Sequence, residues 1–489
     1  MKTAYKNIFK ATTLFGGVQL FNIIINLVRT KLVAMILGPE GVGIHSIYNE
    51  TKELVHESTN IGMDQSGVRG ISLAYEKLKN ASSEQETAIC RENLRQQITY
   101  VRSWEIILSL FGALVMILFA HPLSLMTFQD TEHTWAYIML APAVTFSTIT
   151  CGELVVLKAI RKIKSVAMLS SVNVVLALVV TIPIYYVSGL SGIVPAIIAL
   201  SLCSAVITAL VSYRYNKLYI YWHWRELREA LPMLKLGLCF VITGAMAHGM
   251  ELLIMSYING ESDEATVGLY RAGYTITGTY AALLFNAVSA DFFPRLSGVV
   301  NDVKQRTTTV CQQMEVLLML VGPMSVALLV AMPVLVPLLY DYTFVDMIPM
   351  TRIAVFGVLF SAAYIPAAYL PLAAGDSKMF LFVETISTIT MLLIIVGFSM
   401  EGLVGAGVGK VVSTVIDTVS IFAVAIWYYK VRLSYSYIFL LGCHVLLLVA
   451  SFAVTSILTG VWYWVAGVGI LLLSILTSWE FYKRKAVSQ

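Results

Sequence analysis

Long apolar runs separated by short polar segments recur along the whole chain. A helix needs about 20 mostly apolar residues to cross a bilayer, and these runs are long enough to do so. The breaks between them carry turn residues, as in "GPEG", "SGLSG" and "NGESDE". The pattern predicts an all-α, polytopic membrane protein with fourteen transmembrane helices, at 11–37, 41–68, 102–128, 133–158, 165–188, 190–215, 233–259, 264–293, 311–339, 346–374, 378–400, 402–429, 434–459 and 461–482.

The second of these helices carries an unusual polar face. At 100° per residue, the face spans about 100° of the helix circumference. It consists of His45, Asn49, Lys52, Glu53, His56 and Asn60, and Glu50 and Glu57 widen it. In a bilayer such a face must turn toward a hydrated cavity or toward ionic partners. The alternative is that residues 37–60 form a loop in water.

The distribution of charge decides between these alternatives. Charged residues make up 13% of the chain, against about 25% in soluble proteins. If the N-terminus is cytoplasmic, most of the 33 lysines and arginines fall on cytoplasmic tails and connections, whereas the opposite connections carry acids such as Asp130, Glu261 and Asp263. This is the positive-inside pattern. A loop at 37–60 would invert it from there on, so we expect the segment to span the membrane and both termini to be cytoplasmic.

Two pairs of short segments predict an internal repeat. "EGVGIHSIY" (40–48) matches "ATVGLYRAGY" (265–274), and "SGLSGIVPA" (188–196) matches "MEGLVGAGV" (400–408). Helices 1–6 and 7–12 would then form two pseudo-symmetric lobes, a transporter architecture with its substrate site between the halves. Glycines also start and pack helices for structural reasons alone. The predicted divisions are an N-terminal lobe at 1–215, a cytoplasmic linker at 216–232, a C-terminal lobe at 233–430 and two extra helices at 431–489.

Four cations lie in the outer half or middle of predicted spans. There a charge costs a few kcal/mol. A hydrated cationic cavity between the lobes would relieve that cost and would attract an anionic substrate. Asn22 and Asn26 share a helix face with the first of the four and extend the polar surface of the cavity. The predicted substrate-binding residues are Arg29, Lys52, Arg271 and Lys410.

Further ionisable groups in the spans are candidates for ion coupling. These are Glu50, Glu57, Glu153, His248 and Glu251. Intramembrane charge marks function by default, and histidine titrates near neutral pH. The alternative is that these groups form salt bridges with the intramembrane bases and serve structure alone.

Motifs for soluble chemistry are missing from the sequence. "GLVGAGVGK" (402–410) resembles a phosphate loop, but valine follows its lysine where serine or threonine is required. The six cysteines are scattered without a CxxC pair, so we expect neither a metal site nor a disulfide, and no cofactor. The basic, aromatic run 215–235 is typical of an amphipathic segment at the membrane surface, and we expect no nucleic-acid partner.

Several segments resemble a known family. "RTKLVAMILGPEGVGIHSI" (29–47) and "NIGMDQSGVRGIS" (60–72) are similar to the opening of bacterial polysaccharide flippases, including O-antigen translocases. "VGLYRAGYTI" (267–276) and "FFPRLS" (292–297) are similar to their second half. The chain therefore resembles members of the multidrug/oligosaccharidyl-lipid/polysaccharide exporter superfamily along nearly its whole length.

The resemblance implies a function without enzymatic chemistry. It implies a flippase that moves undecaprenyl-pyrophosphate-linked oligosaccharide repeat units from the cytoplasmic to the periplasmic leaflet of the bacterial inner membrane, by alternating access. It also implies that Arg29, Lys52 and Arg271 contact the pyrophosphate or the sugars. Polysaccharide polymerase machinery is a further partner to expect. The alternatives are a cation-coupled multidrug exporter of the same superfamily and an integral-membrane glycosyltransferase or polymerase.

Overall fold

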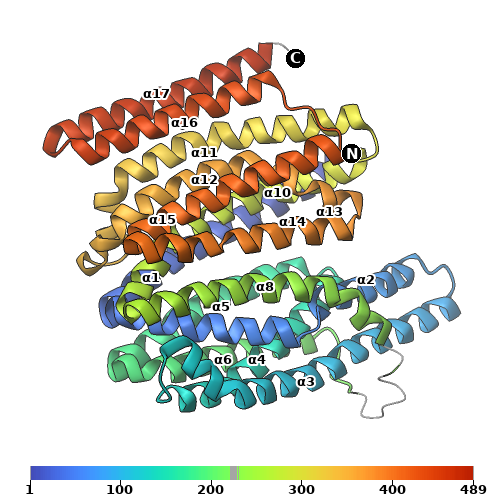
Figure 1. The fold of residues 1–489 in the computed structure, drawn as a ribbon. Helices are drawn as coiled ribbons and strands as arrows, with labels where there is room; N and C mark the ends of the chain where they lie inside the picture. Colours follow the sequence, from blue (N-terminus) through green and yellow to red (C-terminus); the bar gives the residue numbers. More distant parts are fainter. Residues whose placement is uncertain (1, 221–227, 229–230, 488–489) are drawn as a thin grey trace. The chain divides into compact units, whose positions relative to one another are not determined.

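The computed structural model describes residues 2–220, 228 and 231–487, and every regular element in these ranges is a helix (Figure 1). The helices group into two compact units, which divide after Ala265. The first unit contains α1 (Lys2–Thr59), α2 (Met63–Asn80), α3 (Glu84–Phe128), α4 (Thr134–Ala159), α5 (Ile163–Ser188), the 3-10 turn η1 (Gly189–Gly192), α6 (Ile193–Tyr213) and α8 (Leu231–Glu261).

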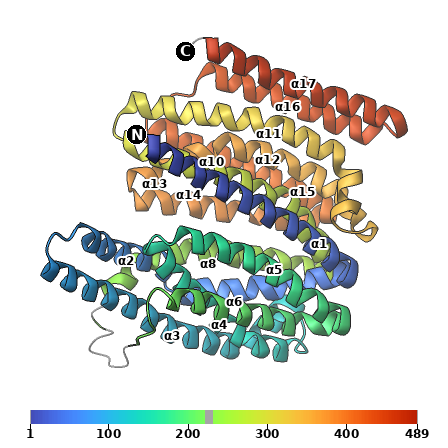
Figure 2. The same cartoon turned by 180° about the vertical axis from the view of Figure 1, so that it is seen from behind.

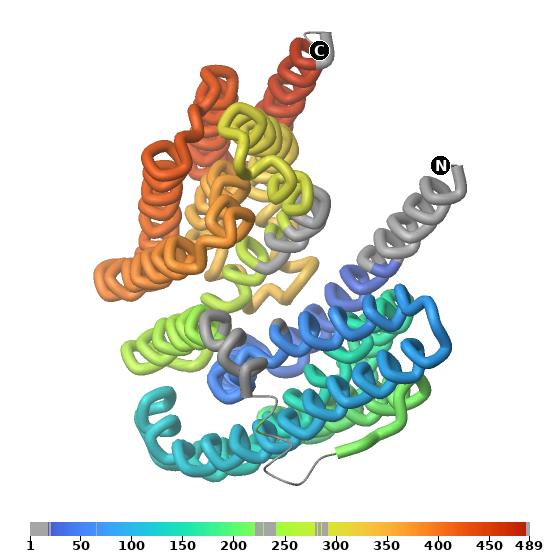
Figure 3. The backbone as a smooth tube through the Cα atoms, turned by 90° about the vertical axis from the view of Figure 1, so that its right-hand side faces the viewer, coloured from blue at the N-terminus to red at the C-terminus, as the bar shows by residue number. Residues whose placement is uncertain are grey.

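The first helix is two helices joined at Gly38. This residue has φ 64° and ψ −174°, a conformation that glycine adopts without strain, and Pro39 follows it. The second predicted helix extends less far than residue 68. It ends at Thr59 because Ile61 (φ 51°) and Gly62 (φ 60°) turn the chain out of the helix. The next helix, α2, then forms a hairpin with the first turns of α3 (Figures 2 and 3).

The second unit is also built of helices. It contains α9 (Glu264–Tyr274), the π-helical turn η2 (Thr275–Thr279), α10 (Tyr280–Val299), α11 (Val303–Leu339), η3 (Tyr342–Met347), α12 (Ile348–Ala368), α13 (Leu370–Ala374), α14 (Ser377–Thr390), α15 (Leu392–Ala423), the π-helical turn η4 (Val424–Tyr428), α16 (Tyr435–Ile457) and α17 (Gly460–Val487). Within this unit α11 packs on α12, α16 and α17. The last two helices lie side by side at one edge (Figure 1).

The chain reverses direction inside α15. Glu401 and Gly402 leave the helical conformation, and Gly402 has φ 57°. The two arms then return along each other in close contact. A Cβ atom at Gly397 would clash with the carbonyl of Gly405, and one at Gly409 would clash with the carbonyl of Leu393. Glycine at these positions lets two helix backbones approach closely, as in membrane helix pairs.

Among the described residues, ten helical stretches are long and apolar enough to cross a membrane. Three of them, of 39, 51 and 52 residues, contain the reversals at Gly38, at η1 and at Glu401–Gly402, so each holds two helices. Apolar side chains also face outward, as for Val187, which is 83% exposed. The chain is a multi-pass membrane protein, and the count of fourteen helices stays a prediction.

The two compact units do not divide where the sequence predicts the lobes to divide. The predicted linker is 216–232, of which 221–227 and 229–230 lie outside the described residues. Helix α8 follows this segment but packs on α1, α2 and α3. Its glycines permit the contact, because Gly249 lies against Leu54 and Gly244 lies against the Glu57 carboxyl. The assignment of the lobes by repeat stays a prediction.

Candidate functional site

The polar face of α1 packs partly against α8, and one pair joins them. Nδ1 of His248 lies 2.5 Å from Oε1 of Glu50, across a sequence separation of 198 residues. The Glu50 side chain is 6% exposed and that of His248 is 34% exposed. Two predicted ion-coupling residues therefore share a hydrogen bond, with the carboxyl inside and the imidazole at its accessible edge.

Lys52 and His56 occupy the next turns of the same face. Lys52 Nζ lies 2.8 Å from Glu53 Oε1, with the lysine side chain 10% exposed and the glutamate side chain 31% exposed. His56 is buried, and its Nδ1 shares a 3.0 Å hydrogen bond with Thr148 Oγ1 of α4. Lys52 is therefore a buried cation whose partner remains open to its surroundings, which suits exchange of that partner for an anionic group.

Arg29 lies against α5 in the first unit. Its Nε is buried and has no hydrogen-bond partner among the described residues, and the same is true of the Tyr185 hydroxyl. Tyr185 stands close to Arg29 and also makes an edge-on contact with the ring of His45, at 6.3 Å between centroids. Closer to the N-terminus, Asn22 donates from Nδ2 to Ser170 Oγ of α5 at 3.0 Å. Helices α1 and α5 therefore enclose a polar seam.

The other predicted polar positions of the first unit differ in burial. Asn26, Asn49 and Glu57 are half-buried. Glu251 is 5% exposed. Glu57 lies against Gly244 of α8. The assignment of Glu57 and Glu251 to ion coupling stays a prediction.

Glu153 has a well-defined structural partner. Arg102 of α3 donates from Nε to Glu153 Oε1 at 2.9 Å and from Nη2 to Oε2 at 2.8 Å. The same guanidinium also donates to the carbonyls of Asn216 and Lys217 and to the Ser212 hydroxyl. Both side chains are at most 5% exposed. This bidentate ion pair ties α3, α4 and the end of α6 together.

Glu105 is a buried acid that sequence reasoning missed. It is 3% exposed and lies one turn after Arg102. Both carboxyl oxygens are buried and have no hydrogen-bond partner among the described residues. A charged carboxylate in such a position is costly. Its spacing of three residues from Arg102 was the available signal, because it places the two side chains on one helix face.

In the second unit, Arg271 and Lys410 meet at one aromatic ring. The Arg271 guanidinium carbon lies 5.5 Å from the Tyr274 ring centre, and Lys410 Nζ lies 5.8 Å from it. Lys410 and Tyr274 line a cavity of about 170 Å³ between η2, α12 and α15. Two predicted substrate-binding residues thus come together although they lie 139 positions apart in the sequence, and one of them lines a cavity.

A second cavity in this unit shares Phe285 and Ile365 with the first. Its volume is about 360 Å³, and Glu384 and Ser387 of α14 line it. Behind Ser387 lies Asp417, whose carboxylate accepts hydrogen bonds of 2.9 Å from Ser387 and from Thr390. Lys410 therefore lines one of these two adjoining cavities, and the carboxyl group of Glu384 lines the other.

Metal binding finds no support among the described residues, where no group of three histidine, cysteine, aspartate or glutamate side chains is placed to hold an ion. The four predicted cations fall in two compact units, with Arg29 and Lys52 in the first and Arg271 and Lys410 in the second. Their convergence on one cavity stays a prediction.

Comparison with known proteins identifies the family of this chain. A family model described as "Polysaccharide biosynthesis protein" matches residues 85–349, just over half of the chain. No curated protein sequence matches significantly.

Solved structures identify the fold. Lipid II flippase MurJ, in an inward closed conformation, gives a TM-score of 0.71 at 14% identity, over 97% of this chain and 100% of that chain. An inward-facing multidrug resistance MATE family transporter of the MOP superfamily gives 0.64 at 14% identity, over 86% and 99%. A MOP superfamily transporter from Pyrococcus furiosus gives 0.59 at 11% identity, over 86% and 94%.

At these identities the structures establish the fold, and these structural relatives are flippases and transporters rather than enzymes. The fold is the one that the sequence resemblance implies, and the matched family connects it to polysaccharide synthesis. The chain therefore belongs to the polysaccharide biosynthesis protein family, with the fold of MurJ and the MOP-superfamily transporters.

Proposed function

We propose that this protein flips an undecaprenyl-pyrophosphate-linked oligosaccharide repeat unit from the cytoplasmic to the periplasmic leaflet by alternating access. The family and the fold support this proposal, because the family is one of polysaccharide biosynthesis and the similar structures are flippases and transporters. The cargo would carry at least two negative charges on its pyrophosphate. An inside-negative potential then drives it outward by about 2.3 kcal/mol per charge per 100 mV, so ATP hydrolysis is not needed.

The observation that carries the proposal is a buried lysine in a transmembrane helix. The Lys52 side chain is 10% exposed, and its partner Glu53 is only half-buried. A buried pair contributes little net stability compared with apolar packing, so structure alone gives a weak reason for the charge. A pyrophosphate could replace Glu53 as the partner of Lys52. Arg29 would supply a second cation in this unit, and Arg271 and Lys410 would supply the cations of the other.

The pair formed by Glu50 and His248 is the best candidate for ion coupling. The hydrogen bond between them is short, and the imidazole is accessible at 34%. A proton that moves to this pair would change the charge on the face that carries Lys52. In the proposed cycle, the charge of this pair would differ between the cargo-bound and the empty transporter.

The test is complementation of a strain that lacks its own polysaccharide flippase. Lys52→Gln and Arg271→Gln each remove one cation with little change in size, and we expect surface glycan to fall at least tenfold with each. The control is Lys79→Gln, which removes an exposed cation at the end of α2. Glycan output is normalised to the amount of protein in the membrane. Wild-type output from both variants would refute the assignment of these cations to the cargo.

A cation-coupled multidrug exporter is the alternative within the same fold, because multidrug resistance MATE transporters are similar structures. The family match favours polysaccharide synthesis. Drug susceptibility of the same strain separates the two functions. We expect no change in susceptibility to cationic drugs when the protein is expressed, and restored glycan in the same cells.

A further inference from the structure

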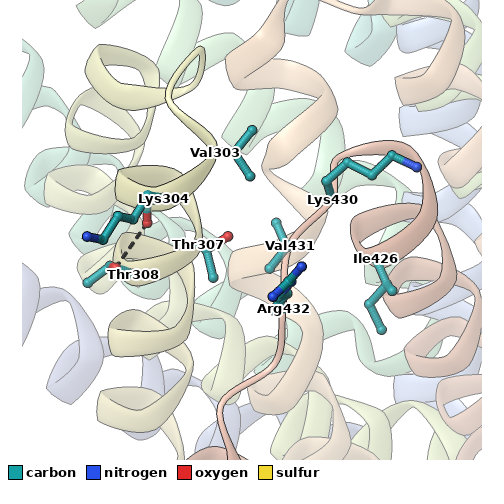
Figure 4. Close-up of a pocket in the computed structure, with 8 residues that line it drawn as sticks. All are labelled: Val303, Lys304, Thr307, Thr308, Ile426, Lys430, Val431 and Arg432. Atoms are coloured by element: carbon teal, nitrogen blue, oxygen red, sulfur yellow. Dashed lines mark hydrogen bonds between the residues drawn. The ribbon is translucent and has the colours of Figure 1, made fainter.

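A basic pocket lies at one end of the second unit, apart from the cavities near Lys410 (Figure 4). Its volume is about 670 Å³. One wall is the first two turns of α11, and the other is the connection that leads from η4 to α16. The lining residues are Val303, Lys304, Thr307, Thr308, Ile426, Lys430, Val431 and Arg432.

The polar lining is suited to an anion. Three of the eight lining residues are cations, two are threonines and none is acidic. Figure 4 shows the Arg432 side chain in the middle of the pocket, near Thr307, with Lys304 and Lys430 at opposite rims. Arginine binds phosphate through two parallel hydrogen bonds. The exposed lysine side chains change rotamer within nanoseconds, so their ammonium groups can turn toward a ligand at the centre.

The remaining lining is apolar, and exposed aromatic residues flank the connection in sequence. Val303, Ile426 and Val431 supply the apolar wall. Trp427 and Tyr435, on either side of the connection, are 74% and 83% exposed. Exposed tryptophan and tyrosine at helix ends are typical of the membrane–water interface. The pocket therefore lies where the headgroups of lipids lie, and the positive-inside pattern assigns it to the cytoplasmic leaflet.

The connection that carries these cations is fixed to α11. Arg306 donates from Nη1 to the Val300 carbonyl at 2.6 Å and from Nη2 to the Tyr429 carbonyl. The Cys311 thiol donates to the Arg432 carbonyl at 3.4 Å. Lys430 also holds a left-handed backbone conformation, with φ 57°, which is uncommon for a residue with a side chain. Two of these contacts, Arg306 to Tyr429 and Cys311 to Arg432, hold the pocket wall against α11.

We propose that this pocket binds the phosphate of a lipid headgroup in the cytoplasmic leaflet, with Arg432 and Thr307 on the phosphate and the rim lysines around it. Basic pockets between transmembrane helices on this side of a membrane bind anionic headgroups. Two kinds of lipid present such a phosphate, namely a bulk anionic phospholipid and an isoprenyl diphosphate. The proposal does not depend on the flippase function, because phospholipid binding would remain if no glycan were moved.

The test measures lipid binding to the purified full-length protein in a neutral detergent. The probes are dioleoylphosphatidylglycerol, dioleoylphosphatidylcholine, farnesyl diphosphate and inorganic pyrophosphate, followed by native mass spectrometry and thermal stabilisation. The variant is Lys430→Gln with Arg432→Gln. The matched control is Lys378→Gln with Arg484→Gln, which removes two exposed cations of the same unit that do not line the pocket.

We expect phosphatidylglycerol, but not phosphatidylcholine, to bind and stabilise the wild type and the control. Removal of two cations next to a charged headgroup should raise the half-saturating concentration of phosphatidylglycerol about thirtyfold for the variant. Displacement of phosphatidylglycerol by farnesyl diphosphate would identify the diphosphate lipid as the preferred source, and no displacement would identify the phospholipid. Thr307→Val removes the hydroxyl group but keeps the shape and the charge of the side chain. It provides a second variant if the double variant does not fold.

Two results would overturn the proposal. The first is that phosphatidylglycerol and phosphatidylcholine bind equally well to the wild type, to the double variant and to Thr307→Val. The second is binding of inorganic pyrophosphate alone, which would make the pocket a site for a soluble anion.

Discussion

The charged side chains within the spans differ in how completely the protein satisfies them. The Arg102–Glu153 pair is fully hydrogen-bonded and buried. Lys52 has one acidic partner that is itself half-buried. Glu105 has no hydrogen-bond partner among the residues that the structure describes. The bidentate pair joins α3 to α4, whereas Lys52 and Glu105 are buried with fewer partners.

The Arg102–Glu153 pair gives the first prediction. Removing one member of a buried pair leaves the other charge uncompensated, which costs about 3–5 kcal/mol. We expect Glu153→Ala to lower the free energy of unfolding by about 3 kcal/mol, because backbone carbonyls still engage Arg102. Unfolding by denaturant in detergent measures the loss.

A surface pair provides the control for this experiment. Glu92 lies 3.9 Å from Arg95, and both side chains are exposed, so Glu92→Ala should change stability by less than about 1 kcal/mol. Replacement of both buried partners, Arg102→Met with Glu153→Leu, should cost less than Glu153→Ala alone. A Glu153→Ala variant as stable as the wild type would show that the pair contributes nothing to the fold.

At the scale of elements, helix ends outside the membrane respond to pH. Asp302 caps α11, and its side chain accepts hydrogen bonds from the amides of Lys304 and Gln305 at 2.8 and 3.1 Å. The Gln305 and Lys304 amides hold the pKa of the Asp302 carboxyl below its usual value. Stability from this cap is present above the unfolded pKa of about 3.9. It is lost as the pH falls through the lower pKa of the folded state.

Hydrogen exchange measures this prediction. The protection factors of the first-turn amides of α11 should stay constant from pH 8 to about 5 and should fall below about pH 4. The amide of Tyr437 is the control, because the hydroxyl of Ser434 caps α16 and does not titrate in this range. Asp302→Asn should remove the pH dependence. Equal acid responses at both caps would contradict the prediction.

The hairpin within α15 gives a prediction about packing. A Cβ atom at Gly397 would clash with the backbone of Gly405, which cannot rotate away. We expect Gly397→Ala to cost about 1–3 kcal/mol, as overpacked cores do. Gly442→Ala in α16 is the matched control, since nothing lies within 4 Å of its added methyl, and it should be neutral or slightly stabilising. Thermal unfolding of the two variants side by side measures the difference.

Elements of this protein are easier to predict from sequence than their contacts. The bilayer fixes the length of an apolar helix, so runs such as 434–459 closely match their observed helices. The end of the second helix was missed because Ile61 adopts positive φ, which is rare for a β-branched residue. The pairing of Glu50 with His248 depends on how α8 packs, and no local pattern encodes it.

At the scale of the whole molecule, the distribution of charge predicts which side of the membrane each connection occupies. The hairpin of α2 and α3 carries cations such as Lys77, Lys79 and Arg91, and the turn between α3 and α4 carries Asp130 and Glu132. Cations next to a span favour the cytoplasmic side by the positive-inside rule. The two connections should therefore lie on opposite sides of the membrane, although only α3 separates them.

Cysteine labelling in spheroplasts tests this arrangement. Ser82 and Thr131 are both exposed and lie in these two connections. Thr131→Cys should react with a membrane-impermeant maleimide in intact spheroplasts, whereas Ser82→Cys should react only after permeabilisation. The parent chain provides the background from its own cysteines, of which five are buried or half-buried. The opposite result would place the basic connections outside, and the proposed pocket at Arg432 would then face the periplasmic leaflet.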